Sequence, residues 1–332
     1  MLFICEKVSY HKHIVNHQLK REVTEMKAFG YTKFGGPEVF ETIEVNEPEI
    51  SAGNQVIVET KVVGLNNFER SQRAGMFGGS NFPIIPGRDL VGEIIQVGAD
   101  VNDFQVGDLV IAQGGPSYAD KVVLTTSHIV KKPGNVSNED AVALVTPGIT
   151  AYNMLTQFTE VKKGNTVLVN GASGGVGTII VQVAKALGAH VIGIASSRNE
   201  QLLKDLGVDE MGFYDQEDVG AKFANQADVV LNAALNGNND ALIDQVVKPD
   251  GQAATVGQGA ELPNKPRVNV EHVHPLSATI NHKALTELTQ MLANGDVKVN
   301  IFKQLPLTLQ GVIDGHELLE SSHAPGRIVL VR

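Results

Sequence analysis

The sequence is poor in cysteine, and this excludes two kinds of stabilisation. Cys5 stands alone, so no internal disulfide can form and no zinc cluster built from cysteines can assemble. Positive charge is also scarce, because 27 lysines and arginines face 37 aspartates and glutamates and leave a net charge of −10. Nucleic-acid binding requires a basic surface, so this balance argues against a nucleic-acid partner.

Long apolar runs are missing as well. The longest candidate, residues 176–195, is interrupted by Gln182, Lys185 and His190, so no segment is expected to insert into a membrane. The composition, 42% hydrophobic and 19% charged, is that of an ordinary folded protein, and 332 residues suffice for two domains with separate cores. We therefore expect a cytoplasmic, acidic enzyme or binding protein.

A glycine-rich stretch, residues 166–177, is the most informative local pattern. An apolar β-branched run typical of a buried strand leads into a turn with four glycines, and apolar residues at helical spacing follow. Strand, turn and helix in this order form the phosphate-binding corner of a dinucleotide fold, where the backbone approaches a pyrophosphate at a helix N-terminus. The residues predicted to bind a cofactor here are Gly171, Ala172, Ser173, Gly174, Gly175, Val176 and Gly177.

The alternative is a tight turn of the kind that any packed strand–helix unit requires. A second predicted strand, 190–195, ends about 20 residues after the turn, where the ribose-binding residue of such folds lies. The agreement of strand, turn, helix and second strand favours the dinucleotide site.

Turn signals and periodicity divide the chain into parts. Short strands separated by glycine and proline over residues 26–147 predict a small β barrel or sandwich. Alternating strands and helices over 148–280 predict an α/β fold with a doubly wound parallel sheet. The mixed tail, 281–332, is expected to fold back onto the first domain and complete it.

The expected elements can be stated by residue number. The helix that starts at Asn138 is expected to break at Pro147. The first part should contain strands 26–34, 40–45, 55–64, 92–97, 108–112 and 118–123. The middle part should contain strands 167–169, 191–195, 210–214, 229–232 and 253–257, with helices 199–206, 217–224 and 239–247. The tail should contain helix 283–294, strand 297–302, helix 309–322 and strand 327–331.

Residues 1–25 differ from the rest. We interpret them as an extension that is disordered or not native, with Met26 as the true start, because residues 21–23 can be encoded by a purine-rich run resembling a bacterial ribosome-binding site. Elsewhere, His272 and His274 would share one face of a predicted strand, so a two-histidine metal site is conceivable. No third ligand lies nearby in the sequence, which argues against it.

Several motifs together carry a family resemblance over residues 26–332. In these motifs the sequence resembles the medium-chain dehydrogenase/reductase superfamily, and within it the zinc-free quinone oxidoreductases. The resemblance implies a GroES-like β-barrel catalytic domain, a Rossmann NADP-binding domain inserted before the final segment, an active cleft between them, and a homodimer. Besides the glycine turn, the motifs are GGPEV (35–39), GLNNFE (64–69), PGRDLVG (86–92), VGDLV (106–110), GITAY (148–152) and GRIVL (326–330).

The resemblance allows a zinc site to be tested by position. In zinc-dependent alcohol dehydrogenases of this superfamily, a cysteine, a histidine and a further cysteine or histidine hold the catalytic metal. The matching positions here are Asn66, Arg88 and Thr146. Because arginine repels a cation, and amides and hydroxyls are poor zinc ligands, we expect no metal and a reaction that does not depend on zinc.

The residues after the second strand of the nucleotide-binding domain bear on the choice of cofactor. They are Ser196, Ser197 and Arg198, with no Asp or Glu among them. A carboxylate there would bind the ribose hydroxyls of NAD, whereas hydroxyls and a guanidinium favour the 2′-phosphate of NADPH. The alternative is that Ser197 or Asn199 only caps the next helix. By resemblance, Tyr214 also reaches the 2′-phosphate.

The resemblance implies roles for further residues. Asn66 is expected to donate a hydrogen bond to the acceptor carbonyl; alternatively it is a turn amide that satisfies local backbone. Glu69 is expected to orient Arg73 or, with a raised pKa, to act as a general acid. The cofactor-binding residues implied in this way are Arg73, Thr150, Gly257, Gln258 and Arg327.

With no metal, flavin motif or nucleophile, hydride is expected to pass from NADPH to an acceptor that is already electrophilic. We therefore predict a zinc-independent NADPH-dependent oxidoreductase acting on quinones or related activated carbonyl compounds. The alternatives are an alkenal or enone double-bond reductase and a non-catalytic NADPH-binding sensor protein.

Overall fold

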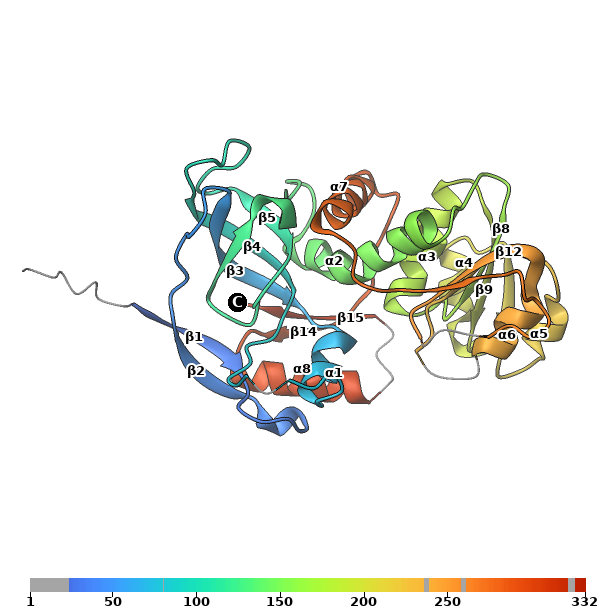
Figure 1. Cartoon of the computed structure of the whole chain (residues 1–332), viewed down its shortest axis with the longest axis horizontal. Helices are drawn as coiled ribbons and strands as arrows, with labels where there is room; N and C mark the ends of the chain where they lie inside the picture. The colour runs from blue at the N-terminus through green and yellow to red at the C-terminus, as the bar shows by residue number, and fades with distance from the viewer. Residues whose placement is uncertain (1–23, 80, 236–238, 258–260, 322–325) are drawn as a thin grey trace, which may run out of the picture.

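The computed structural model describes residues 24–79, 81–235, 239–257, 261–321 and 326–332. The predicted extension 1–25 lies outside these residues except for Thr24 and Glu25, and Glu25 begins the first strand. Two lobes lie side by side, joined by helices at the centre (Figure 1). In the part of the chain that is described, no helix combines the length and apolar character needed to span a membrane.

The first lobe is rich in antiparallel strands. Its central strand is β3 (Gln55–Gly64), which is buried along most of its length and pairs with three neighbours. The two N-terminal strands form a separate antiparallel pair. The other strands of this lobe from the first part of the chain are β1 (Glu25–Gly30), β2 (Glu41–Asn46), β4 (Asp89–Val97), β5 (Leu109–Gln113), β6 (Lys121–Thr125) and β7 (Ile129–Lys131).

The C-terminal segment returns to this lobe. β15 (Arg327–Val331), at its predicted position, pairs antiparallel with β3, and the sheet order is β14-β15-β3-β4-β5-β7 with β6 on β3. β14 begins at Ile301 rather than at residue 297. The helix expected from 283 begins at Ala278, because the Ser277 hydroxyl caps it by accepting from the Ile280 N–H. The segment contains α7 (Ala278–Asn294), β14 (Ile301–Pro306), α8 (Leu309–Glu320) and β15.

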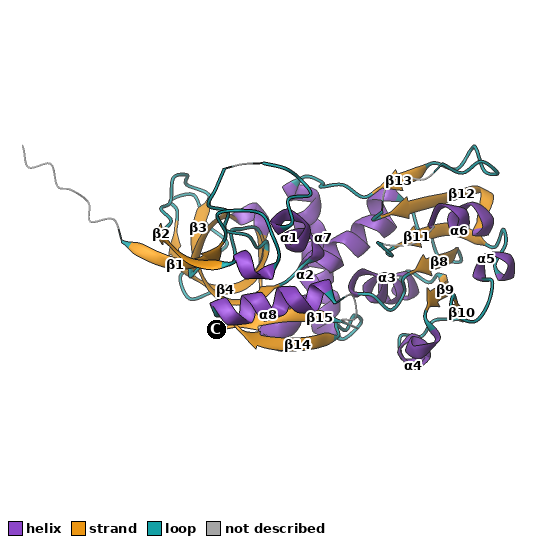
Figure 2. Ribbon diagram, turned by 90° about the horizontal axis from the view of Figure 1, so that it is seen from below, coloured by secondary structure: helices purple, strands orange, loops and turns teal. Residues whose placement is uncertain are grey.

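The second lobe is a doubly wound parallel sheet, as the alternating pattern predicts. Its strand order is β10-β9-β8-β11-β12-β13, with every pair parallel (Figure 2). This is the 3-2-1-4-5-6 order of dinucleotide-binding folds, whose ligands lie at the carboxyl edge of the sheet. The elements are β8 (Thr166–Asn170), α3 (Gly175–Ala186), β9 (His190–Ala195), α4 (Glu200–Asp205), β10 (Glu210–Phe213), α5 (Val219–Lys222), β11 (Ala227–Asn232), α6 (Asn239–Val246), β12 (Val247–Thr255) and β13 (Val270–His272).

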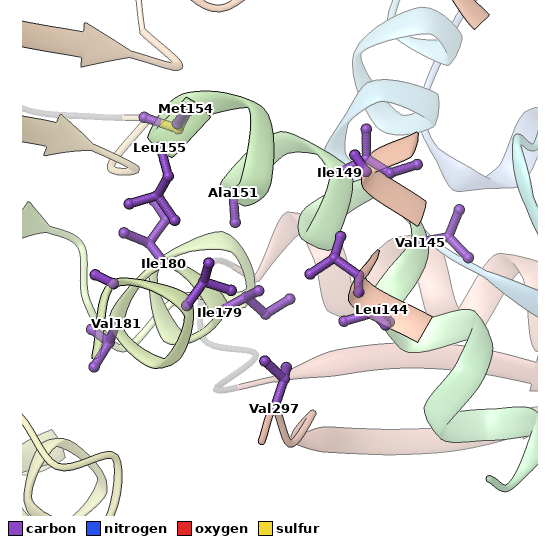
Figure 3. Packing of buried hydrophobic residues seen from close by; sticks show 14 of the residues in the cluster. Leu144, Val145, Ile149, Ala151, Met154, Leu155, Ile179, Ile180, Val181 and Val297 are labelled. Atoms are coloured by element: carbon purple, nitrogen blue, oxygen red, sulfur yellow. The ribbon is translucent and has the colours of Figure 1, made fainter. Parts of the chain in front are cut away.

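Helix α2 (Asn138–Asn153) connects the lobes, and the predicted break at Pro147 is wrong. The helix runs through Pro147 and continues as a π-helical turn, Met154–Phe158. The Thr146 N–H finds an acceptor in the Asp89 carboxylate at 3.1 Å. Burial of α2 against α3 and the tail holds the helix together, so packing overrides the helix-breaking tendency of proline (Figure 3). The contributing side chains are Leu144, Val145, Ile149, Leu155, Ile179, Ile180 and Val297.

Candidate active site

The turn between β8 and α3 has the shape that its glycines predict. Gly171 has φ +77°, and a Cβ on Gly177 would lie 2.1 Å from the Gly171 carbonyl oxygen, so both positions require glycine. A Cβ on Gly174 would meet only that same oxygen, at 3.3 Å. Gly174 occupies the N-cap position before α3 and supplies no side-chain cap, so the first N–H groups of the helix remain available to an anion.

A cleft of about 480 Å³ lies between the lobes in front of this turn. Of the predicted cofactor residues it is lined by Thr150, Gly174, Gly175, Val176 and Arg327. Gly171, Gly177 and the buried Ala172 shape the turn without lining the cleft, and the Ser173 hydroxyl accepts from the Asn199 amide at 3.1 Å. Gly257, beside the lining residue Val256, donates its N–H to the Thr255 hydroxyl, whereas Gln258 lies outside the described residues.

Asp89, a fully buried residue that our sequence analysis did not single out, does not line the cleft itself but binds three side chains that do. Its carboxylate accepts hydrogen bonds from the Asn66 amide at 3.0 Å, the Thr146 hydroxyl at 2.5 Å and the Arg327 guanidinium at 3.4 Å. Burial raises the pKa of Asp89, while Arg327 and the donated hydrogen bonds oppose that rise. In each hydrogen bond between the Asp89 side chain and a described residue, Asp89 is the acceptor.

Asn66 therefore does not satisfy the local backbone. It precedes helix α1 (Asn67–Arg73), but its side chain makes no cap hydrogen bond and is turned to Asp89 instead. One amide hydrogen is used in this contact. The second remains for an acceptor in the cleft, which Asn66 lines.

Glu69 is buried at the boundary of a second cavity. This cavity measures about 580 Å³ and shares Phe68 with the cleft. Neither carboxyl oxygen of Glu69 accepts a hydrogen bond from a described residue, and its nearest cation is the Arg88 Nε at 3.8 Å. Burial and, next, the charge of Asp89 raise the pKa of Glu69 to about 7. Besides Glu69, the polar and charged side chains that line this cavity are Gln72, Arg88, Gln113, His128 and Asn281.

The predicted cofactor residue Arg73 is buried at the contact between α1 and α8. Its side chain is fully buried, lies 5.9 Å from the centre of the Phe40 ring and forms an ion pair with Glu320. It lines neither cavity, and no hydrogen bond connects it to Glu69. The resemblance implied that Glu69 orients Arg73, but α8 supplies a different carboxylate, so Arg73 connects α1 to α8.

At the end of β9 the two serines bind a carboxylate that the sequence analysis also missed. Ser196 and Ser197 donate their hydroxyls to Asp215, which follows Tyr214. Neither Ser197 nor Asn199 caps the next helix through its side chain, so that alternative is wrong. The Arg198 side chain is exposed and makes no hydrogen bond or ion pair with any described residue.

Comparison with known proteins identifies the family to which this two-lobed protein belongs. Residues 52–135 match the family described as "Alcohol dehydrogenase GroES-like domain", and residues 175–294 match "Zinc-binding dehydrogenase". The chain is 31% identical to the 2-methylene-furan-3-one reductase of Solanum lycopersicum over 92% of this chain and 79% of that protein. It is 30% identical to the chloroplast envelope quinone oxidoreductase homolog of Arabidopsis thaliana over 92% and 98%. The chain belongs to the medium-chain dehydrogenase/reductase superfamily, in its quinone oxidoreductase-like branch.

A solved structure agrees with this assignment. The quinone oxidoreductase of Coxiella burnetii superimposes with a TM-score of 0.82 at 29% identity, covering 93% of this chain and 100% of that one. This medium-chain oxidoreductase therefore has a GroES-like domain and a Rossmann-like domain that binds a nicotinamide dinucleotide. Its residues fit that cofactor, because the buried Arg327 Nε has no acceptor among the described residues and lies beside the open glycine turn.

The residues at the zinc positions of this superfamily do not fit a metal. Asn66 and Thr146 both donate to Asp89, and the Arg88 guanidinium lies 3.5 Å from the centre of the Phe68 ring. Among the described residues, no three His, Cys, Asp or Glu side chains gather in a way that could hold a metal ion. His274 instead contacts the His272 carbonyl oxygen through its Nδ1, at 2.9 Å, and the Phe158 ring.

Proposed function

We propose that this protein is a zinc-independent, NADPH-dependent reductase that transfers hydride to quinones or related activated carbonyl compounds. The observation that carries the proposal is the junction of the two cavities. The cleft in front of the glycine turn suits a dinucleotide, and the adjoining cavity beyond Phe68 suits an acceptor.

The choice of NADPH rests on the end of β9. The two residues at this position are serines, whose hydroxyls donate to Asp215 in this structure, and the next residue is the exposed Arg198, which pairs with no described residue. Hydroxyls and a guanidinium are donors suited to a 2′-phosphate. Tyr214, 61% exposed at the end of the neighbouring strand, is available to the same group.

At the nicotinamide end, the side chains would bind and orient the reactants. The reduced nicotinamide supplies a hydride when NADPH is bound. Thr150 lines the cleft where it can hold the ring, and Asn66 presents its second amide hydrogen to the acceptor oxygen, where negative charge develops. Glu69, with a pKa near 7 and a place at the acceptor cavity, can hold a proton at its carboxyl oxygen and donate it to the reduced product.

The side chains at the metal positions support independence from zinc. Asn66 and Thr146 are neutral, poor zinc ligands whose side chains donate to Asp89, and the guanidinium of Arg88 repels a cation. Acceptor polarisation is thereby assigned to the Asn66 amide. Such polarisation suffices for acceptors that are already electrophilic and is weak for simple ketones.

An acceptor panel tests the proposal. NADPH consumption would be followed optically with ortho- and para-quinones, 2-alkenals and unactivated ketones. We expect turnover with quinones and none with unactivated ketones. Tight NADPH binding without turnover on any acceptor would instead identify a non-catalytic NADPH-binding protein and contradict the proposal.

A double-bond reductase is the second candidate function. The observation in its favour is the tomato relative, whose named substrate has a methylene group conjugated to a ketone. The same geometry serves both reactions, because Asn66 would bind the carbonyl oxygen while hydride reaches either the quinone or the β-carbon of an enone. Faster turnover of 2-alkenals than of every quinone in the panel would favour this candidate.

A further inference from the structure

The carboxylate of Asp215 fills an anion-binding position at the end of β9. Its Oδ2 atom accepts from the Ser196 hydroxyl at 3.0 Å and from the Ser197 hydroxyl at 2.8 Å. Its Oδ1 atom accepts from the Ser197 N–H at 2.8 Å. Three donors from the two residues that follow β9 thus satisfy both oxygens of one acidic side chain.

This position is the carboxyl edge of the parallel sheet, where the ribose of a dinucleotide lies. Phe213 is paired with Ala195 in the ladder between β10 and β9, and the Tyr214 N–H donates to the Ala195 carbonyl. Asp215 is the next residue, so it reaches across from the end of the neighbouring strand. The carboxylate that the end of β9 lacks is supplied by the turn after β10.

We propose that Asp215 is a specificity-determining residue that competes with the 2′-phosphate of NADPH for the donors of Ser196 and Ser197 and thereby weakens the preference for NADPH over NADH. This inference rests on the proposed use of NADPH. A phosphate and a carboxylate cannot share the same three hydrogens, so NADPH must displace Asp215 before it binds there.

NADH and NADPH would interact differently with the carboxylate of Asp215. The 2′- and 3′-hydroxyls of NADH can donate to Asp215 in its observed position, as they donate to the acidic residue of NAD-binding folds. A 2′-phosphate must turn Asp215 toward solvent and then remains close to its negative charge. Hydrogen bonds from Ser197, first from its N–H, lower the pKa of Asp215, so the residue is charged at neutral pH. Arg198 does not bind Asp215 and attracts a phosphate. Its effect on the cofactor preference is therefore opposite to that of Asp215.

Nucleotide fragments test the inference without reference to any acceptor. Dissociation constants for adenosine 2′,5′-bisphosphate and for 5′-AMP would be measured by calorimetry on wild type, Asp215→Asn and Asp215→Ala. The alanine variant removes the acceptor that asparagine partly retains. Glu210→Gln is the matched control, because it removes one charge from the opposite end of β10, where Glu210 contacts His190.

The quantity to compare is the ratio of the dissociation constant for 5′-AMP to that for the bisphosphate. We expect this ratio to be about tenfold higher in both Asp215 variants than in wild type. The control should change this ratio by less than about twofold. An unchanged ratio in both Asp215 variants would overturn the inference. The proposed NADPH use fails in a different way, namely if wild type and both variants all bind 5′-AMP more tightly than the bisphosphate.

Discussion

The Asn66 amide donates to the Asp89 carboxylate across 3.0 Å, and this contact fixes the group that we assign to acceptor polarisation. Asp89 also accepts from Thr146 and Arg327, so one buried carboxylate orients residues from three separate parts of the chain. An amide held in this way offers its second hydrogen in a fixed direction, which is how a preorganised donor stabilises developing negative charge.

Replacing Asn66 with alanine should therefore slow the chemical step. We expect kcat to fall about 100-fold with a quinone acceptor while KM for NADPH changes little, because the lost donor acts on the acceptor. Steady-state kinetics with both substrates varied would show the division between kcat and KM.

Thr146→Val is the control for an indirect effect through Asp89. It removes a hydrogen bond to the same carboxylate but leaves the Asn66 amide in place. If Thr146→Val lowers kcat as much as Asn66→Ala does, the role assigned to Asn66 is wrong and the loss comes from a disturbed Asp89.

Two glycines of the turn should respond differently to valine. Gly174→Val should abolish dinucleotide binding yet leave the protein folded, because the new side chain points into the ligand space and meets only one backbone oxygen at 3.3 Å. Gly177→Val should cost about 3 kcal/mol of unfolding free energy, because its Cβ would overlap the Gly171 carbonyl at 2.1 Å. Calorimetric binding and urea unfolding separate the two effects. Retained dinucleotide binding by Gly174→Val would refute the placement of the pyrophosphate.

Arg198→Ala should weaken NADPH more than NADH. Loss of a charge-assisted hydrogen bond to the 2′-phosphate should raise KM for NADPH by about tenfold and leave KM for NADH nearly unchanged. Lys204→Ala is a suitable control, since it removes a cation that pairs with Glu200 on α4. Equal effects of Arg198→Ala on the two cofactors would remove the argument for NADPH.

Glu69 should make stability depend on pH. The pKa of Glu69 rises from 4.5 to about 7 in the folded protein, so the folded state holds this proton more tightly than the unfolded state. The contribution of protonated Glu69 to the unfolding free energy is fully present below pH 4.5 and is lost as pH rises through about 7. It amounts to about 3 kcal/mol at 1.36 kcal/mol per pH unit. Glu69→Gln, which stays neutral, should exceed wild type in unfolding free energy by about this amount at pH 8.5.

Urea unfolding of both proteins at pH 4.5 and pH 8.5 measures this difference. An advantage of Glu69→Gln that is the same at both pH values would show that Glu69 is not held protonated. As a general acid, Glu69 should also impose a fall in kcat/KM for the acceptor above pH 7, and this limb should be absent in Glu69→Gln.

Local patterns in the sequence predicted the nucleotide-binding corner well, because strand, turn and helix are contiguous there. The carboxylate network could not be predicted in the same way. Asn66, Asp89, Thr146 and Arg327 lie far apart in the chain, and only the packed structure brings them together. Pro147 illustrates the converse, since burial and the contact with Asp89 overrode a local rule.

Two further contacts differ in how far the strand order alone could have predicted them. Asp215 is the second residue after β10, the strand next to β9, so parallel strand order alone would have indicated an acid beside the two serines. The pairing of Arg73 with Glu320, in contrast, depends on how α8 packs on α1, for which the sequence carries no local signal.

The central claim is that a bound NADPH reduces an already electrophilic acceptor without a metal. Its most direct test is NADPH oxidation by a quinone, measured on the protein before and after exhaustive dialysis against a zinc chelator. We predict equal turnover in both samples, with no gain when zinc is returned. Activity that disappears on dialysis and returns only with zinc would contradict it.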